Sequence, residues 1–75
     1  MIEKLVGKYV EFYDESDEVK VSGKLISVDD VDIELEPHIF HWEDENECNE
    51  YQCFLSIPSD IKEISENEFI KNFNI

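Results

Sequence analysis

The sequence predicts a mainly β protein: a small five-strand antiparallel barrel with a short terminal helix. Three observations support this prediction. Apolar residues alternate with polar ones over several short stretches, as is typical of half-buried strands. Clusters of Asp, Glu and Ser separate these stretches and suit tight turns. A helical stripe of apolar residues lies close to the end of the chain.

The first expected strand covers residues 9–13. Val10 and Phe12 share one face of this strand, and Tyr9 and Tyr13 lie on the other. The acidic residues that follow have nothing apolar to bury and are expected to form a turn.

The second expected strand, residues 19–28, is long, and Gly23 lies near its middle. A glycine inside a strand often marks a bulge or a bend, where the sheet must curl. An acidic turn at residues 29–30 leads to a third strand, residues 31–36. Pro37 is expected to end that strand, because proline cannot donate a ladder hydrogen bond.

A short segment rich in rings, residues 38–42, comes next. The alternation of a strand requires that either Phe40 and Trp42 or Ile39 and His41 point outward. The loop that follows, residues 43–50, carries five carboxylates in eight positions and is expected to project as a mobile hairpin tip.

The barrel is completed by expected strands at residues 51–57 and 61–64. Ser65 with Glu68 three positions later forms a capping box, which predicts the start of the terminal helix. Residues 1–6 are expected to make about one helical turn that covers an open end of the barrel.

Residues 1–75 are expected to form a single acidic β-barrel domain, near the lower size limit for a self-supporting core. Two cysteines are too few for a disulfide scaffold. The chain opens without an apolar leader and contains no membrane-spanning stretch, so a cytoplasmic location is expected.

The formal charge of -14 is the strongest feature of the composition, and the chain contains no arginine. Between Lys24 and Lys62 there is no further lysine. Direct binding to nucleic acid or to an anionic membrane is therefore disfavoured, because both depend on Lys and Arg. A basic protein is the expected partner, unless the acidity serves only solubility. The crowded carboxylates are also expected to raise some folded-state pKa values.

The candidate partner-binding residues combine outward rings with acidic loops, because exposed Tyr and Trp are frequent anchors in interfaces. The rings are Tyr9, Tyr13, Trp42 and Phe54, each of which serves alternatively as part of the core. The acidic members are Glu43, Asp44, Glu45, Glu47, Asp29 and Asp30.

A zinc site is the alternative use of this region. His38, His41, Cys48 and Cys53 are the only potential metal-ligand set, and zinc prefers four such ligands. Their spacing does not match the short C-x2-C loops of zinc sites, so no metal and no cofactor is favoured. No catalytic residues are assigned either, because the chain has no nucleophile motif and no phosphate-binding loop, and an enzyme is not expected.

Two stretches carry a resemblance to known barrels. The runs LVGKYV (5–10), SGKL (22–25) and VD (28–29) resemble the first motif of Sm-like proteins. The run FLSIPSDIKEI (54–64) is similar to the closing segment of small bacterial SH3-like or Sm-like barrels, such as the YolD-like family. The resemblance implies an SH3-like or Sm-like barrel. It does not imply RNA binding, because the second motif of Sm proteins is missing.

These observations together predict a small acidic, non-enzymatic module that docks on a basic protein. In its sharper form the module is a nucleic-acid mimic, an inhibitor or an immunity protein. The alternatives are a zinc-stabilised structural or regulatory domain and a ring-forming Sm-like barrel. A monomer or dimer is favoured over a ring, because -14 charges on each subunit oppose assembly.

Overall fold

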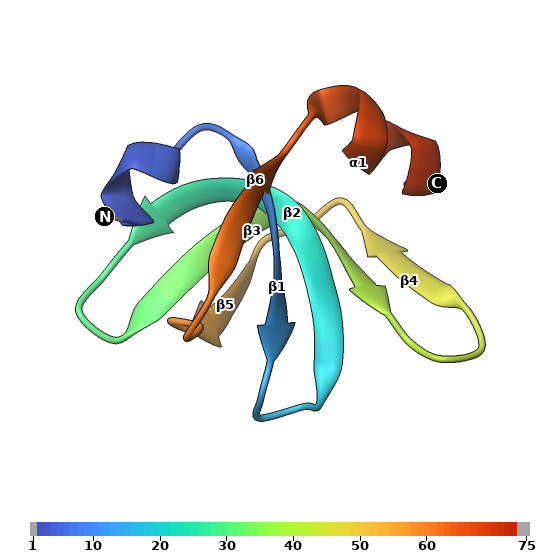
Figure 1. Cartoon of the computed structure of the whole chain (residues 1–75), viewed down its shortest axis with the longest axis horizontal. Helices are drawn as coiled ribbons and strands as arrows, with labels where there is room; N and C mark the ends of the chain where they lie inside the picture. Colours follow the sequence, from blue (N-terminus) through green and yellow to red (C-terminus); the bar gives the residue numbers. More distant parts are fainter. Residues whose placement is uncertain (1, 74–75) are drawn as a thin grey trace.

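The computed structural model describes residues 2–73 and contains six strands, a 3-10 turn and one helix (Figure 1). In chain order the elements are η1 (Ile2–Leu5), β1 (Tyr9–Asp14), β2 (Val19–Val28), β3 (Asp32–His41), β4 (Asn46–Asn49), β5 (Cys53–Ser56), β6 (Ile61–Ile64) and α1 (Glu66–Asn72).

All strand pairs are antiparallel, and the hydrogen-bonded order is β4-β3-β2-β1-β6, with β5 also paired to β3. The predicted class, mainly β with a short terminal helix, is confirmed. The predicted number of strands is wrong, because six strands form an open sheet. The additional strand is β4, which pairs residues 46–49 with the second half of β3 where a mobile loop was expected.

The larger hydrophobic core lies between β1, β2, the first half of β3 and the strands that flank them. Val10, Val21, Leu25 and Leu35 are fully buried in it. Residues from η1, β5 and β6 pack against this core from the side. We call this part of the molecule the body. The first turn of the chain thus covers one end of the sheet, as expected.

A bulge connects the body to the second half of β3. Gly23 pairs with His38 and Leu25 pairs with Leu35, so one residue of β2 faces two residues of β3, Glu36 and Pro37. Bulges are places where a sheet accepts proline, because the ladder is already interrupted there. The prediction that Pro37 ends the strand was therefore wrong: β3 continues through a cis Glu36–Pro37 bond to His41.

Gly23 is required at this bulge for steric reasons. A Cβ atom at position 23 would lie 2.8 Å from the carbonyl oxygen of Pro37, which is closer than van der Waals contact allows. The prediction of a bulge near Gly23 is confirmed by the register shift between Gly23 and Leu25.

A smaller core lies beneath α1, where Phe69 packs with Ile39 and Ile64. The helix begins at the predicted cap: the Ser65 side chain accepts a hydrogen bond from the Glu68 N–H at 3.0 Å. Neither helical segment within residues 2–73 has the length and apolar character needed to cross a membrane.

Candidate aromatic and acidic interaction site

The second half of β3 and β4 form a hairpin, residues 38–49, that we call the arm, and its β3 half also pairs with residues 20–23 of β2. It projects from the end of the molecule opposite the N-terminus, and α1 lies over it (Figure 1). The arm continues the sheet of the body beyond the bulge. Before the bulge, the odd-numbered residues Ile33 and Leu35 of β3 point into the main core. The bulge adds one residue to β3, so after Pro37 the even-numbered side chains point to that same side of the sheet.

Four rings gather on that side of the arm. His38 and Phe40 lie on β3, Trp42 follows its last residue, and Tyr51 lies two residues beyond the end of β4. We call the rings of His38, Phe40, Trp42 and Tyr51 the aromatic face. Trp42 is 41% exposed and Tyr51 is 63% exposed, whereas His38 is buried beneath them.

The rings of this face contact one another in sequence. Phe40 stacks on Trp42 with the ring centroids 5.9 Å apart, and it meets His38 edge to face at 5.3 Å. His38 also contacts Tyr51 edge to face at 5.5 Å. These are favoured geometries for aromatic pairs, so the rings hold one another in fixed orientations.

Polar groups of β4 complete the site. Trp42 Nε1 donates a hydrogen bond to Glu47 Oε1 at 2.9 Å, and Asn49 Nδ2 donates to His38 Nε2 at 3.2 Å. Burial lowers the pKa of His38, and the backbone of Tyr51 and the charge of Glu47 offset this effect only in part. His38 is therefore neutral at pH 7 and accepts the hydrogen bond from Asn49.

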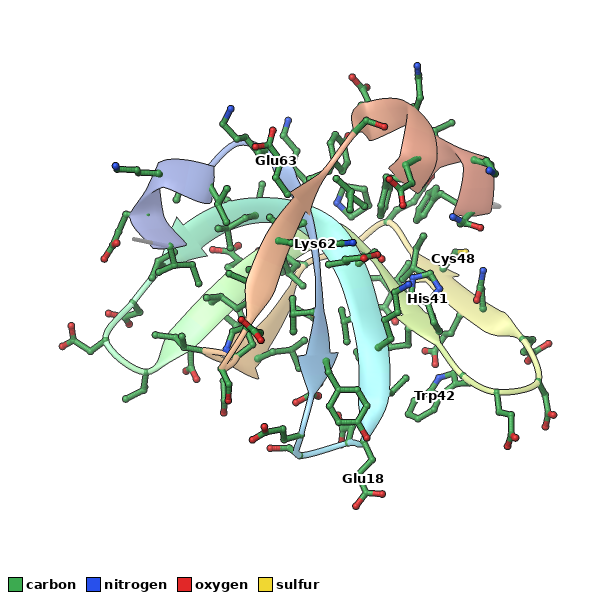
Figure 2. The ribbon with its side chains drawn as sticks, in the orientation of Figure 1. Glu18, His41, Trp42, Cys48, Lys62 and Glu63 are labelled. Carbon is green, nitrogen blue, oxygen red and sulfur yellow. The ribbon has the colours of Figure 1, made fainter. Side chains whose placement is uncertain are left out.

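The other side of the arm is covered by α1. Ile39 is fully buried against Phe69, and the Cys48 thiol donates to the Asn72 carbonyl oxygen at 3.5 Å. Figure 2 shows Cys48 on the side of the helix and Trp42 on the other side. Of the two alternatives left open by the sequence, Phe40 and Trp42 therefore lie on the open face of β3.

The acidic residues surround the tip of the arm. Glu43, Asp44, Glu45 and Glu47 are exposed at or beside the turn between β3 and β4, and Glu50 follows β4. The arm itself carries no lysine, and neither does the rest of the interval between Lys24 and Lys62. Four of the predicted acidic residues and one predicted ring, Trp42, thus lie together on the arm.

The other predicted rings lie elsewhere. Tyr9 is half-buried, and its ring centroid lies 4.8 Å from that of Phe69. It therefore belongs to the small core beneath α1 and not to the candidate binding site. Phe54 is exposed on β5, at the body. Tyr13 is exposed at the end of β1. The sequence analysis placed all three in the same candidate partner-binding set as Trp42, although only Trp42 lies on the arm.

The predicted acidic pair, Asp29 and Asp30, is also distant from the arm. Both residues are exposed in the turn between β2 and β3, and this turn and the arm lie at opposite ends of the long axis (Figure 1). The longest extent of the molecule is 31 Å, so the two acidic turns do not form one continuous surface.

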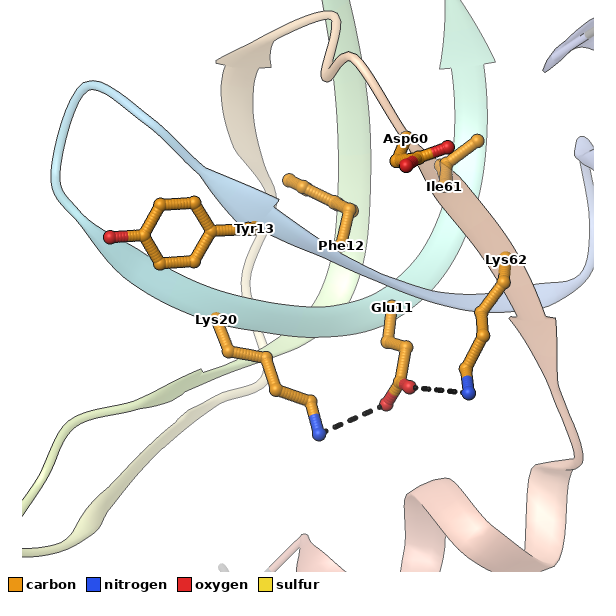
Figure 3. A pocket seen from close by; sticks show the side chains of 7 residues that line it. All are labelled: Glu11, Phe12, Tyr13, Lys20, Asp60, Ile61 and Lys62. Atoms are coloured by element: carbon orange, nitrogen blue, oxygen red, sulfur yellow. Dashed lines mark ion pairs between the residues drawn. The ribbon is translucent and has the colours of Figure 1, made fainter.

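A concave region lies away from the arm, along β1, where Tyr13 forms part of a groove of about 530 Å3 (Figure 3). Its centre is Glu11, whose two carboxylate oxygens contact Lys20 Nζ at 3.2 Å and Lys62 Nζ at 3.1 Å. Burial acts to raise the pKa of Glu11, but the hydrogen bonds from the two lysines outweigh it, and the pKa is lowered. This groove presents a neutralised carboxylate and two ammonium groups, which suits a basic partner poorly.

The four potential zinc ligands do not converge. His38 and His41 point to different sides of β3, and Cys48 faces α1. Cys53 packs against the core of the body, and burial, with the charge of Asp14, raises its pKa to about 11. Among residues 2–73, no three or more His, Cys, Asp or Glu side chains are arranged to hold a metal ion.

Ser22 and His41 are joined by a hydrogen bond of 2.8 Å between Oγ and Nε2. A Ser–His contact is one part of a nucleophilic site, but Ser22 is only 3% exposed. The bond joins β2 to the last residue of β3, beside the tip of the arm, and is best described as a structural link. Burial and the charge of Lys20 lower the pKa of His41, against the opposing effects of Asn46 and Glu11.

Sequence reasoning missed Tyr51 and His38 as parts of the site. Tyr51 was expected in a strand on the same face as Cys53, but β5 begins only at Cys53. The ring spacing His38, Phe40, Trp42 does carry a signal, since a strand places residues of the same parity on one face. It did not indicate which face would be exposed.

No family model, curated protein or solved structure matches the chain. The functional argument below therefore depends on the geometry of the chain alone.

Proposed function

We propose that this chain is a small acidic, non-enzymatic binding module that docks on a basic protein through its arm. The observation that carries the proposal is the position of the aromatic face beside the acidic tip of the arm. Exposed Trp and Tyr are typical anchors in protein interfaces, and a surrounding field of carboxylates accelerates encounter with a basic surface.

The location of the rings supports this use of the arm. The aromatic face is the continuation of the face that the body buries in its main core, yet Trp42 and Tyr51 remain substantially exposed. Large exposed rings that are held in place by one another, by Glu47 and by Asn49 are preorganised, which reduces the entropy lost on binding.

The proposal in its sharper form is that the chain imitates the phosphates of a nucleic acid and blocks the site of a nucleic-acid-binding protein. The charge of -14 and the lysine-free interval support this form, because an array of carboxylates offers a basic groove the same sign of charge as a phosphate backbone. A mimic and the nucleic acid would then exclude each other from the partner.

The test is to titrate the protein against a panel of purified basic nucleic-acid-binding proteins at low and at physiological salt. Asp44→Asn with Glu45→Gln removes two charges from the arm, and Asp29→Asn with Asp30→Asn removes two from the opposite end. We expect the arm variant to bind at least about fivefold more weakly at low salt and the control to bind like the native protein.

Equal loss in both variants would mean that the protein acts as an ion exchanger without a defined site. Affinity that does not change with salt would exclude steering by charge. Competition by duplex DNA for the partner distinguishes the mimic from a module that docks elsewhere on the same protein.

A further inference from the structure

We propose that the aromatic face recognises arginine: a guanidinium of the partner stacks on the open side of the Trp42 indole and pairs with the carboxylate of Glu47. This inference rests on the docking function proposed above and names the group that the arm would bind.

Phe40 occupies one side of the Trp42 ring. The two rings stack with an angle of 22° between them, and Trp42 is nonetheless 41% exposed. The side away from Phe40 is therefore the side that a partner can reach. Trp is the aromatic side chain that attracts a cation most strongly across its ring face.

Glu47 is held at the edge of this ring. Its Oε1 accepts the indole N–H at 2.9 Å, which fixes the carboxylate close to the plane of the ring system. A carboxylate accepts hydrogen bonds at both oxygens, so Oε2 can receive an N–H group of a cation that lies over the indole. A planar guanidinium meets both requirements at once, because it stacks on a ring through its face and donates through its edge.

The other members of the aromatic face are compatible with a cation. Tyr51 adds a second exposed ring at the far end of the face. His38, which links the rings, is neutral because burial lowers its pKa, so it does not repel a positive charge. The carboxylates of residues 43–50 raise the local concentration of cations around the arm.

Lysine is the competing occupant, and its chemistry fits less well. Its ammonium group is compact and strongly hydrated, and it cannot stack on the indole while donating in the plane of Glu47. The inference is therefore tested by comparing the affinity for an arginine side chain with the affinity for a lysine side chain.

Trp42 is the only tryptophan of the chain, so its fluorescence reports on this site alone. The experiment titrates the full chain with an arginine-containing Gly/Ser peptide and with the counterpart in which each arginine is replaced by lysine. We expect the arginine peptide to change the Trp42 emission and to bind about fivefold more tightly than the lysine peptide at equal salt.

Two pairs of variants localise the effect, with affinities measured by calorimetry. Trp42→Leu should remove the preference for arginine, whereas Phe54→Leu, which removes an exposed ring from β5, should retain it. Glu47→Gln should reduce the preference, whereas Glu34→Gln should not. Glu34 is a matched control, since it also accepts one side-chain hydrogen bond, from Ser27 Oγ at 3.0 Å.

Equal affinity for the two peptides, or an arginine preference that survives Trp42→Leu, would overturn the inference. If binding in that case still weakened with salt and with the two charge changes at Asp44 and Glu45, the docking function would stand without arginine recognition. If neither peptide nor any basic protein bound, the docking function itself would fail. Circular dichroism of each variant confirms that a loss of binding is not a loss of fold.

Discussion

The body and the arm belong to the same sheet, but they differ in what covers their two faces. In the body, the core face is enclosed by η1, β5 and β6, and its apolar side chains are almost completely buried. In the arm, α1 covers the opposite face, and the continuation of the core face keeps Trp42 and Tyr51 exposed. The comparison teaches that the cover of the core face extends past the bulge over His38 and Phe40 and then ends, so that the outer rings of the same face become a surface.

The comparison is tested most strongly by removing one buried side chain from each region. Phe69→Ala, on the side of α1 that packs against the arm, should lower the free energy of unfolding by about 3 to 4 kcal/mol. Leu35→Ala, in the body, should lower it by about 3 kcal/mol, because each change leaves a cavity in a closed core. Urea unfolding followed by far-ultraviolet circular dichroism and by Trp42 fluorescence measures the whole sheet and the arm separately.

We expect both probes to give the same transition in each variant, since Ile39 of β3 contributes to the core beneath the helix. Val31→Ala serves as the control, because this exposed side chain should change the free energy by less than about 0.5 kcal/mol. A fluorescence transition that separates from the dichroism transition in Phe69→Ala would show that the arm unfolds independently of the body.

A smaller effect is expected beside the tip of the arm, where Ser22 and His41 link β2 to β3. Ser22→Ala should lower the free energy of unfolding by about 1 kcal/mol, because it removes a buried hydrogen-bond partner of the imidazole. Ser27→Ala is a close match, since Ser27 also lies on β2 and bonds a side chain of β3, Glu34, but in an exposed position. If urea unfolding shows the same decrease in the free energy of unfolding for both variants, the Ser22–His41 bond has no special structural role.

The smallest effect concerns pH and the buried carboxyl group of Asp14 at the end of β1. Burial is the main cause that raises its pKa, and the charge of Asp17 adds to it, against a hydrogen bond from the Ser16 N–H at 3.3 Å. A carboxyl group with a raised folded-state pKa binds its proton more readily in the folded state. Its contribution to stability therefore increases as pH falls from neutral through the folded-state pKa, and is complete below the unfolded-state pKa.

Asp14→Asn removes this contribution and retains an oxygen that can accept from Ser16. Relative to the native protein, the free energy of unfolding of the variant should be highest near neutral pH. As pH falls, the native protein should become more stable relative to the variant. The difference between the two is the quantity to measure, because His38 and His41 act in the opposite direction: their lowered pKa values make the folded state lose stability as pH falls below the unfolded-state value. A difference that does not vary with pH would contradict the role of Asp14.

The body could be predicted from the sequence because its strands obey a simple alternation. The limits of β2 and β6 and the cap at Ser65 followed from periodicity, turn residues and the capping box. The expectation of raised carboxyl pKa values is met at Asp14, although burial contributes more there than crowding does.

The arm could not be predicted in the same way, because three of its features break local rules. Pro37 lies inside a strand at a bulge, and this bulge reverses the parity of the side chains that follow it. β4 is too acidic to carry a hydrophobic pattern, and it forms through pairing with β3. Which face of the arm is open depends on where α1 docks, and that is a tertiary contact with no local signature.

The two separate pairings of β3 have a consequence for how such a protein can vary. Leu35 lies directly opposite Cys53 in the ladder, so the chain leaves the body and returns to it at adjacent positions. Residues 36–52 are therefore an insertion between two strands that are already neighbours, and a change in the length or sequence of this insertion need not disturb the pairing of β3 with β5. The insertion is constrained at its first strand, where residues 38–41 pair with residues 20–23 of β2 and where Ile39 supports α1. Exchange of this segment between related proteins could thus alter what is bound while the fold is retained.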